Sequence, residues 1–208
     1  MPQNGLIPID AVVFDYGEVI AGGDAEDWAR MVAVANVAAP AFFESYWRYR
    51  LDYDRGWTPQ EYWSKVAHDA GTEFSEEQFR DLLQADANHW MHVREPVVDW
   101  ILRLKQAGKK LGLISNMPSG FATFFRREFS WLQQFESLVL SCDLRVVKPD
   151  PEIYLEALRQ LNVAPERALF LDDKDYNVAG AHAVGMQGIV VDSLEGIQPR
   201  LARYELPL

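Results

Sequence analysis

Polar side chains follow four short apolar segments, and their types could together carry out metal-dependent chemistry on an anion. They are Asp15 in VVFDYGEVI, Ser115 and Asn116 in GLISNMP, Lys148 in VVKPDPEIY, and Asp172 and Asp173 in LFLDDKDYN. In open α/β sheets, ligands bind beyond the carboxyl ends of the strands. We therefore expect these carboxylates, the hydroxyl, the amide and the ammonium group to converge at one edge of a sheet.

Three carboxylates at one edge would repel one another, and one would take up a proton unless a cation lay between them. Oxygen ligands without His or Cys nearby favour a hard cation, and Mg²⁺ fits best because it binds through one or two carboxylates plus a phosphate. An Asp beside such a metal can attack phosphorus and form an aspartyl-phosphate. Lys148 would neutralise charge on carboxylate and phosphoryl oxygens, while Ser115 and Asn116 would donate hydrogen bonds to the phosphoryl oxygens.

The elements that must position these residues alternate along much of the chain. Apolar, β-branched segments predict buried strands over 11–14, 111–114, 137–141, 169–171 and 188–191. Helical patterns, with Pro or Gly near their ends, predict helices over 96–107, 151–161 and 178–184. This alternation indicates an α/β protein with a doubly wound, Rossmann-like parallel sheet.

The alternation is interrupted from about Gly23 to Val93. Thr58 with Glu61 and Ser75 with Gln78 have the spacing of capping boxes, so this stretch reads as helices throughout. We predict an inserted all-helical domain over 23–93 and a core formed by 1–22 and 94–208. Its aromatic residues are expected mainly in its own hydrophobic core, and Arg48, Arg50 and Arg55 as solvated surface charges.

Composition excludes several classes of protein. With 208 residues, 49% of them hydrophobic, the chain can bury a sizeable core, and its net charge of −11 argues against nucleic acid as a partner. The single cysteine, Cys142, cannot form an internal disulfide and fits a reducing compartment, so we expect a cytoplasmic protein. No apolar run is long enough to cross a bilayer, and the start MPQNGLIPID does not read as a signal peptide.

The order of these motifs resembles the haloacid dehalogenase superfamily over nearly the whole chain. A helical insertion after the first motif is similar to the C1-type cap of that superfamily. Within the cap, YDRGWT at 53–58 and EYW at 61–63 are similar to the branch that contains a bacterial α-glucose-1-phosphate phosphatase, as is Asp-x-Gly in the first motif. The resemblance implies a Rossmann-like core under a C1 cap and a Mg²⁺-dependent hydrolase.

The resemblance also implies a role for each motif residue. Asp15 matches the nucleophile and a metal ligand, and the backbone carbonyl of Gly17 another metal ligand. Ser115 and Asn116 match the phosphate binders, and Lys148 matches the charge-neutralising lysine. Asp172 and Asp173 match the acidic metal pair, and Asp173 is the stronger candidate of the two for a metal ligand. Asn177 lies where many relatives have a further Asp, so we expect it to support the metal site from behind.

Gly17 departs from the pattern, because most phosphatases of the superfamily have an Asp there that acts as general acid and base. A lost proton donor commonly lowers the rate by roughly 10²- to 10⁴-fold. Glu18, a cap residue or water could supply the proton. Alternatively, the substrate could have a leaving oxygen that departs without protonation by a general acid, as the anomeric oxygen of a sugar 1-phosphate does more readily than an ordinary alcohol.

These observations predict a Mg²⁺-dependent phosphatase of a small phosphorylated metabolite, with a sugar phosphate as one candidate. A 2-haloacid dehalogenase is an alternative, but those enzymes usually have Tyr two residues after the nucleophile and lack the acidic pair. A non-catalytic phosphate-binding regulatory module is another, although it would not need Asp15. Residues 23–93 hold 13 acidic and 6 basic residues, which favours a compact, singly phosphorylated substrate. Monomer and homodimer both remain open.

Overall fold

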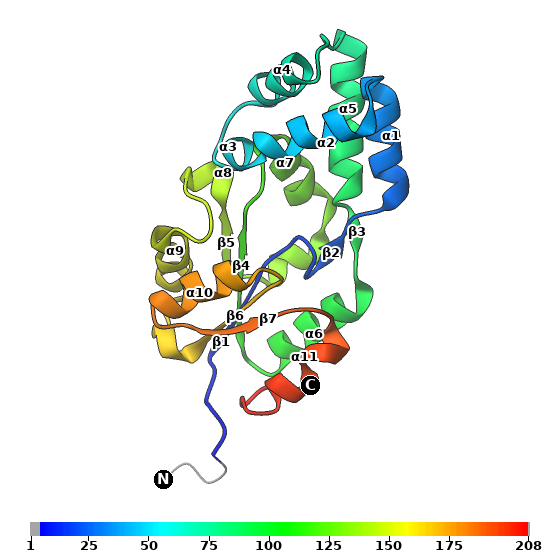
Figure 1. The fold of residues 1–208 in the computed structure, drawn as a ribbon. Coiled ribbons are helices and arrows are strands. Elements are labelled where there is room, and N and C mark those ends of the chain that lie inside the picture. Colours follow the sequence, from blue (N-terminus) through cyan, green and yellow to red (C-terminus); the bar gives the residue numbers. More distant parts are fainter. Residues whose placement is uncertain (1–4, 208) are drawn as a thin grey trace.

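A five-stranded parallel sheet forms the centre of the molecule (Figure 1). The computed structural model describes residues 5–207, and the sheet has the order β5-β4-β1-β6-β7. Its strands are β1 (Ala11–Phe14), β4 (Lys110–Ser115), β5 (Ser137–Leu140), β6 (Ala168–Asp172) and β7 (Gln187–Val190). Every strand pair is parallel, so all five carboxyl ends lie along one edge. This confirms the predicted α/β, Rossmann-like fold.

Helices cover both faces of this sheet. Val12 and Phe14 of β1 face the hydrophobic cluster that includes residues of α6, α7 and α11, while Ala11 and Val13 face the cluster that includes residues of α9 and α10. The bounds are α6 (Glu95–Gln106), α7 (Ser119–Glu128), α8 (Ser141–Leu144), α9 (Pro151–Leu161), α10 (Asp175–Ala183) and α11 (Leu194–Leu201). Alternate residues of the central strand are therefore buried on opposite faces.

Five further helices lie beyond the carboxyl ends of the strands (Figure 1). They are α1 (Ala25–Ala35), α2 (Ala39–Arg48), α3 (Arg50–Asp54), α4 (Pro59–Asp69) and α5 (Glu76–His89). They share a separate hydrophobic cluster of mostly aromatic residues, and α1 packs along α5. The short antiparallel pair of β2 (Ala21–Gly22) and β3 (His92–Val93) joins this helical region to the sheet on the way in and on the way out.

The helical region agrees with the expectation of helices as far as α5, but the last two residues of the stretch, His92 and Val93, form the strand β3 because they pair with β2. Both predicted capping boxes are present. The side chains of Thr58 and Ser75 each accept a hydrogen bond from the backbone N–H of the third helical residue, and their own backbone N–H groups donate to the side chain of that residue. We retain 23–93 as the proposed cap and the flanking stretches as the proposed core. The ends of that core, residues 1–4 and 208, lie outside the described residues.

Several boundaries differ from the predictions by a few residues. α10 begins at Asp175 rather than 178, because its first turn is polar and gives no apolar periodicity. α7 and α11 were not predicted; α7 is short, yet it buries Phe121 and Phe125 against the sheet. Among residues 5–207 no helix is long and apolar enough to cross a membrane.

Candidate active site

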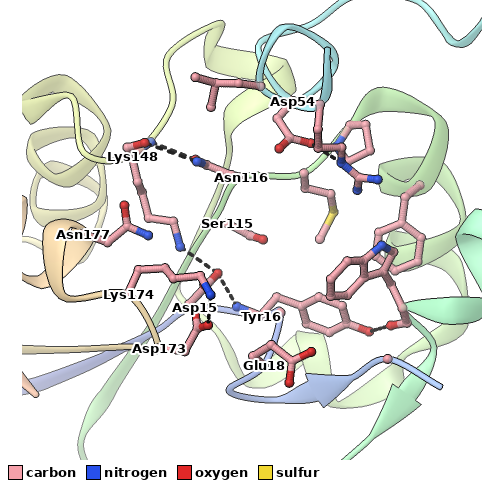
Figure 2. A pocket seen from close by; sticks show the side chains of 18 of the residues that line it. Asp15, Tyr16, Glu18, Asp54, Ser115, Asn116, Lys148, Asp173, Lys174 and Asn177 are labelled. Carbon is pink, nitrogen blue, oxygen red and sulfur yellow. Dashed lines mark hydrogen bonds and ion pairs between the residues drawn. The ribbon is translucent and has the colours of Figure 1, made fainter. Parts of the chain in front are cut away.

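A cavity of about 580 Å³ lies between the carboxyl ends of the strands and the helical region. Its floor includes Asp15, Ser115, Asn116, Lys148 and Asp173, which Figure 2 shows around one open space. Gly17 and Glu18 also line the cavity. The structure therefore brings the predicted site residues together from four separate loops, with Asp172 buried directly behind them.

Lys148 is the buried cation of this floor. Its Nζ lies 2.7 Å from Asp15 Oδ1 and 2.6 Å from Asp172 Oδ2, and its side chain is only 1% exposed. Burial by itself lowers the pKa of Lys148, but the charges of Asp15 and Asp172 outweigh burial and raise it above its usual value. The ammonium group therefore stays protonated and holds both carboxylates in place.

Asp15 follows the last residue of β1 and faces the cavity. Its Oδ1 accepts a hydrogen bond from the backbone N–H of Tyr16 at 2.6 Å in addition to the ion pair with Lys148. Burial, and then the charge of Asp172, raise the pKa of Asp15 to about 8, against the opposing effect of Lys148. A bound cation would lower this pKa by favouring the ionised carboxylate.

The acidic pair divides into a buried and an open member. Asp172 is fully buried; its Oδ1 accepts from the backbone of Lys174 at 2.8 Å, and Asn177 Nδ2 donates to both of its oxygens at 3.0 and 3.1 Å. Asp173 lines the cavity and pairs with Lys174 at 2.7 Å. Asn177, which also lines the cavity, therefore holds Asp172 in place, and its support of a metal site stays a prediction.

Three carboxylates are close enough to hold one ion. One oxygen from each of Asp15, Asp172 and Asp173 lies within 4.8 Å of the others. The donors are all oxygens, which suits a hard cation such as Mg²⁺. Asp173 is the more accessible of the acidic pair, because both oxygens of Asp172 already accept hydrogen bonds.

Ser115 and Asn116 leave β4 side by side but have different surroundings. Asn116 Nδ2 donates to the backbone carbonyl of Lys148 at 3.2 Å, and its Oδ1 accepts from the backbone N–H of Lys148 at 2.8 Å. The Asn116 side chain thus fixes the loop that carries the lysine, a role that sequence reasoning missed. Ser115 is buried and lines the floor of the cavity, a position from which it could contact a phosphate as predicted.

Gly17 lies under the indole ring of Trp90 from the end of the helical region. A Cβ atom added at Gly17 would lie 3.2 Å from Trp90 Cζ3, so the ring covers the direction in which a side chain would project. Tyr16 reinforces this arrangement, because its hydroxyl donates to the Trp90 carbonyl at 2.6 Å. The space that the usual second Asp would need is therefore partly filled.

Glu18 is the nearest carboxylate in sequence, yet it has another partner. Its backbone is left-handed with φ 58°, and its Oε2 pairs with Arg94 Nη2 at 2.8 Å. The side chain is 46% exposed and lines the cavity. The predicted acid or base role for Glu18 would require it to leave Arg94, so it stays a prediction.

The helical region supplies a roof that the sequence did not reveal. Its lining residues are Gly23, Trp28, Trp47, Arg50, Leu51, Asp54, His89 and Trp90. Arg50, expected as a surface charge, is instead buried and pairs with Asp54 and with Asp86 at 3.1 Å each. α3 is only five residues long, so no periodicity marked its buried side.

Comparisons with known proteins agree with this geometry. The family model described as haloacid dehalogenase-like hydrolase matches residues 9–185. The chain is 23% identical over 188 residues to the putative phosphatase YhcW of Bacillus subtilis, covering 88% of this chain and 83% of that protein. It is also 36% identical over 87 residues to a phosphorylated carbohydrates phosphatase of Thermotoga maritima, covering 41% of this chain and 40% of that protein.

Solved structures share the fold. A HAD family enzyme of Bacteroides thetaiotaomicron in complex with magnesium and inorganic phosphate superposes with a TM-score of 0.73 at 20% identity, covering 91% of this chain and 99% of the other. L-2-haloacid dehalogenase from Xanthobacter autotrophicus gives a TM-score of 0.66 at 21% identity, covering 93% and 82%. The narrower resemblance to the α-glucose-1-phosphate phosphatase branch stays a prediction. The family match over most of the chain, together with the converging motif residues, shows that this protein belongs to the haloacid dehalogenase-like hydrolases.

Proposed function

We propose that this hydrolase is a Mg²⁺-dependent phosphatase that cleaves a small phosphomonoester through an aspartyl-phosphate on Asp15. The observation that carries the proposal is the cluster of Asp15, Asp172 and Asp173 around the buried Lys148. Even with Lys174 paired to Asp173, three carboxylates and two ammonium groups leave a net negative site, which calls for a further cation before an anionic phosphate can enter. Phosphatases among the relatives support the same reaction type.

The metal would be held by Asp15, the backbone carbonyl of Gly17 and Asp173, with Asp172 completing the acidic set. When bound, Mg²⁺ supplies positive charge to the phosphoryl oxygens and lowers the pKa of neighbouring carboxyl groups. The all-oxygen donor set fits this ion, and the acidic pair distinguishes the site from that expected of a 2-haloacid dehalogenase. Likeness to the Xanthobacter dehalogenase concerns the fold alone.

The protein residues divide the reaction between them. Asp15 Oδ1 is occupied by Lys148 and by the Tyr16 N–H, so Oδ2 is the oxygen that attacks phosphorus. The new O–P bond forms as the bond from phosphorus to the leaving oxygen breaks, and the departing alkoxide takes a proton. Lys148 and Ser115 stabilise charge on the phosphoryl oxygens. Water then attacks the aspartyl-phosphate, which releases inorganic phosphate and restores the Asp15 carboxylate.

Proton supply limits the choice of substrate. Gly17 offers no carboxylate, and the Trp90 ring partly covers it. We therefore propose that water protonates the leaving oxygen, which favours esters whose oxygen leaves readily, such as sugar 1-phosphates and aryl phosphates. A cytoplasmic location and a small phosphorylated metabolite as substrate belong to the same proposal.

The test is phosphate release from aryl, sugar 1- and sugar 6-phosphates by the wild type and by Asp15→Asn, with Mg²⁺ or with a chelator. We expect activity that needs both Asp15 and the metal, and higher rates on the aryl and 1-phosphates. Equal rates on all three esters would overturn the leaving-group argument. Metal-independent halide release from a 2-haloacid would replace the proposal by dehalogenation, and a protein inert towards every ester would favour a binding module.

A further inference from the structure

We infer that the outer part of the cavity, formed by Trp47, Leu51 and Tyr176, is a subsite for an uncharged, ring-bearing leaving group. The inference rests on the proposed phosphatase function and specifies the class of its substrate. The phosphoryl group would occupy the polar floor near Asp15, while the ring of the leaving group would lie against these apolar side chains.

Exposed apolar side chains gather at this cavity. Among residues 5–207, the large hydrophobic residues with high exposure are Leu6, Trp47, Leu51, Leu144, Leu155 and Tyr176. Three of these six, Trp47 at 52%, Leu51 at 47% and Tyr176 at 56%, line the one cavity that also contains Asp15. Single exposed apolar residues are ordinary, but a group of them at the rim of a pocket marks a binding surface.

The three side chains come from both parts of the molecule. Trp47 and Leu51 belong to α2 and α3 of the helical region, and Tyr176 belongs to α10 beside the sheet. All three therefore line one cavity only because the helical region lies over the strand ends. A ligand between them would contact both parts at once.

Trp47 is held as a fixed platform. Its ring packs edge-on against Tyr46 with 4.9 Å between centroids and against Trp28 at 5.8 Å. Trp28 in turn packs on the imidazole of His89 at 4.1 Å. The ring of Trp47 is thus supported on one side and exposed on the other. Such a surface suits the flat face of an aryl group or the C–H face of a sugar.

Charged groups near the outer part of the cavity are already paired within the protein. Arg50 pairs with Asp54 and Asp86, and Lys174 pairs with Asp173. Among the described lining residues, this leaves Lys148 as the buried cation of the floor, next to the attacking Asp15. A second phosphate or a carboxylate on the leaving group would find no unpaired Lys or Arg in the described part of the cavity lining, and Lys174, whose side chain is 52% exposed, is the one of these cations that a metal bound to Asp173 would release. The pairing therefore favours an uncharged leaving group.

The size of the cavity agrees with this assignment. Its volume of about 580 Å³ falls within the usual range of small-molecule sites and exceeds what a phosphoryl group needs. The remaining space leaves room for a leaving group of the size of a ring.

The experiment measures kcat and KM of Trp47→Ala and Tyr176→Ala on phenyl phosphate, a hexose 1-phosphate and acetyl phosphate, which has no ring. We expect KM for the two ring-bearing esters to rise at least about fivefold, because stacking and burial are lost, while KM for acetyl phosphate changes less than about twofold. Trp47→Phe should restore most of the affinity. Leu155→Ala is the matched control, since Leu155 is 51% exposed on α9 and does not line the cavity.

The outcomes separate the subsite from the reaction. If acetyl phosphate is hydrolysed through Asp15 but Trp47→Ala and Tyr176→Ala leave every KM unchanged, or if phosphoglycolate is the better substrate, the subsite is wrong and the phosphatase stands. If no ester is hydrolysed, calorimetric binding of phenyl phosphate to the wild type and to Trp47→Ala tests the subsite alone. Tighter binding by the wild type supports it, and equal binding overturns it.

Discussion

Two buried cations, Lys148 at the strand ends and Arg50 in the helical region, line opposite sides of the same cavity, and each pairs with two carboxylates. Around Lys148, the partners Asp15 and Asp172 emerge from neighbouring strands, and Asp15 reaches the cavity. The cluster adjoins a further carboxylate, Asp173, which pairs with Lys174, so three carboxylates face two ammonium groups and the site keeps a negative charge.

Arg50 has a closed environment by contrast. Its guanidinium pairs with Asp54 and Asp86 and lies 5.3 Å from the ring centroid of Tyr46 and 5.8 Å from that of Trp90. Tyr46 also donates to Asp86 at 2.6 Å, so both carboxylates have hydrogen-bond partners within the protein. One cation and two carboxylates therefore have different roles in the two places. The open cluster of Lys148, Asp15 and Asp172 can react, while the closed cluster of Arg50, Asp54 and Asp86 holds α2, α3 and α5 together.

Replacing the cation of the open cluster should have the largest effect. Lys148→Met is expected to lower kcat by at least about 10³-fold, because charge on the phosphoryl oxygens loses its buried partner. Steady-state phosphate release with Mg²⁺ measures this. Lys105→Met, which removes a partly exposed lysine paired with Glu136, is the control and should keep wild-type activity. Retention of more than a tenth of the activity in Lys148→Met would contradict the assignment.

Replacing the cation of the closed cluster should mainly affect folding. Arg50→Met leaves the buried Asp54 and Asp86 without a counter-charge, which is expected to lower the free energy of unfolding by about 3 kcal/mol. Urea unfolding followed by circular dichroism measures the change. Arg159→Met, at an exposed pair with Glu156, should change it by less than about 0.5 kcal/mol. Similar losses in both variants would remove the distinction between the two clusters.

Mg²⁺ should stabilise the folded protein by binding at the open cluster and not at the closed one. At a hundredfold excess over its dissociation constant, an ion that binds the folded state adds about 2.7 kcal/mol, enough to raise the thermal midpoint by several degrees. Asp173→Asn is expected to abolish this rise. Asp27→Asn alters the second acidic cluster, with Asp24 and His92, and should preserve the rise. A rise that persists in Asp173→Asn but disappears in Asp27→Asn would place the ion elsewhere.

The smallest expected effect concerns the pH dependence of the closed cluster. Burial raises the pKa of Asp54 to about 6, although the charge of Arg50 opposes the rise. A carboxyl group with a raised pKa binds its proton more tightly in the folded state, so its contribution to stability is present near pH 4 and is lost as the pH rises through 6. The stability of the wild type minus that of Asp54→Asn should fall by about 2 kcal/mol between pH 4 and 7.

Urea unfolding at a series of pH values tests this sign. Asp192 provides the opposite case, because the backbone N–H of Ser193 lowers its pKa. The difference between wild type and Asp192→Asn should therefore be flat or increase with pH. A difference for Asp54→Asn that also increases with pH would show that this carboxyl group is not buried as described.

Much of the floor of the site was predictable because parallel strands end at one edge. Asp15, Ser115, Lys148 and Asp173 each follow or adjoin a short apolar segment, so local patterns are enough to place them at that edge. The same rule predicted the sheet and the interruption by helices. The phosphate-binding role of Asn116 stays a prediction, and the structure adds that its side chain holds the backbone of Lys148.

The roof was not predictable in the same way. Trp47 and Arg50 belong to an aromatic, helical stretch in which periodicity does not distinguish a core residue from a pocket residue. Their surroundings depend on which side of α2 and α3 lies over the sheet. The contact between Trp90 and Gly17 likewise joins residues 73 positions apart.

Local patterning and strand order were enough to predict the fold class, the floor residues and the missing carboxylate at Gly17. The folded chain was needed to show which carboxylates pair with Lys148, that Arg50 is buried, and that Trp47 and Tyr176 line one cavity. The physical reason is that hydrophobic patterning specifies which residues are buried in each element. How one set of helices packs on another set of strands depends on contacts between residues far apart in the chain.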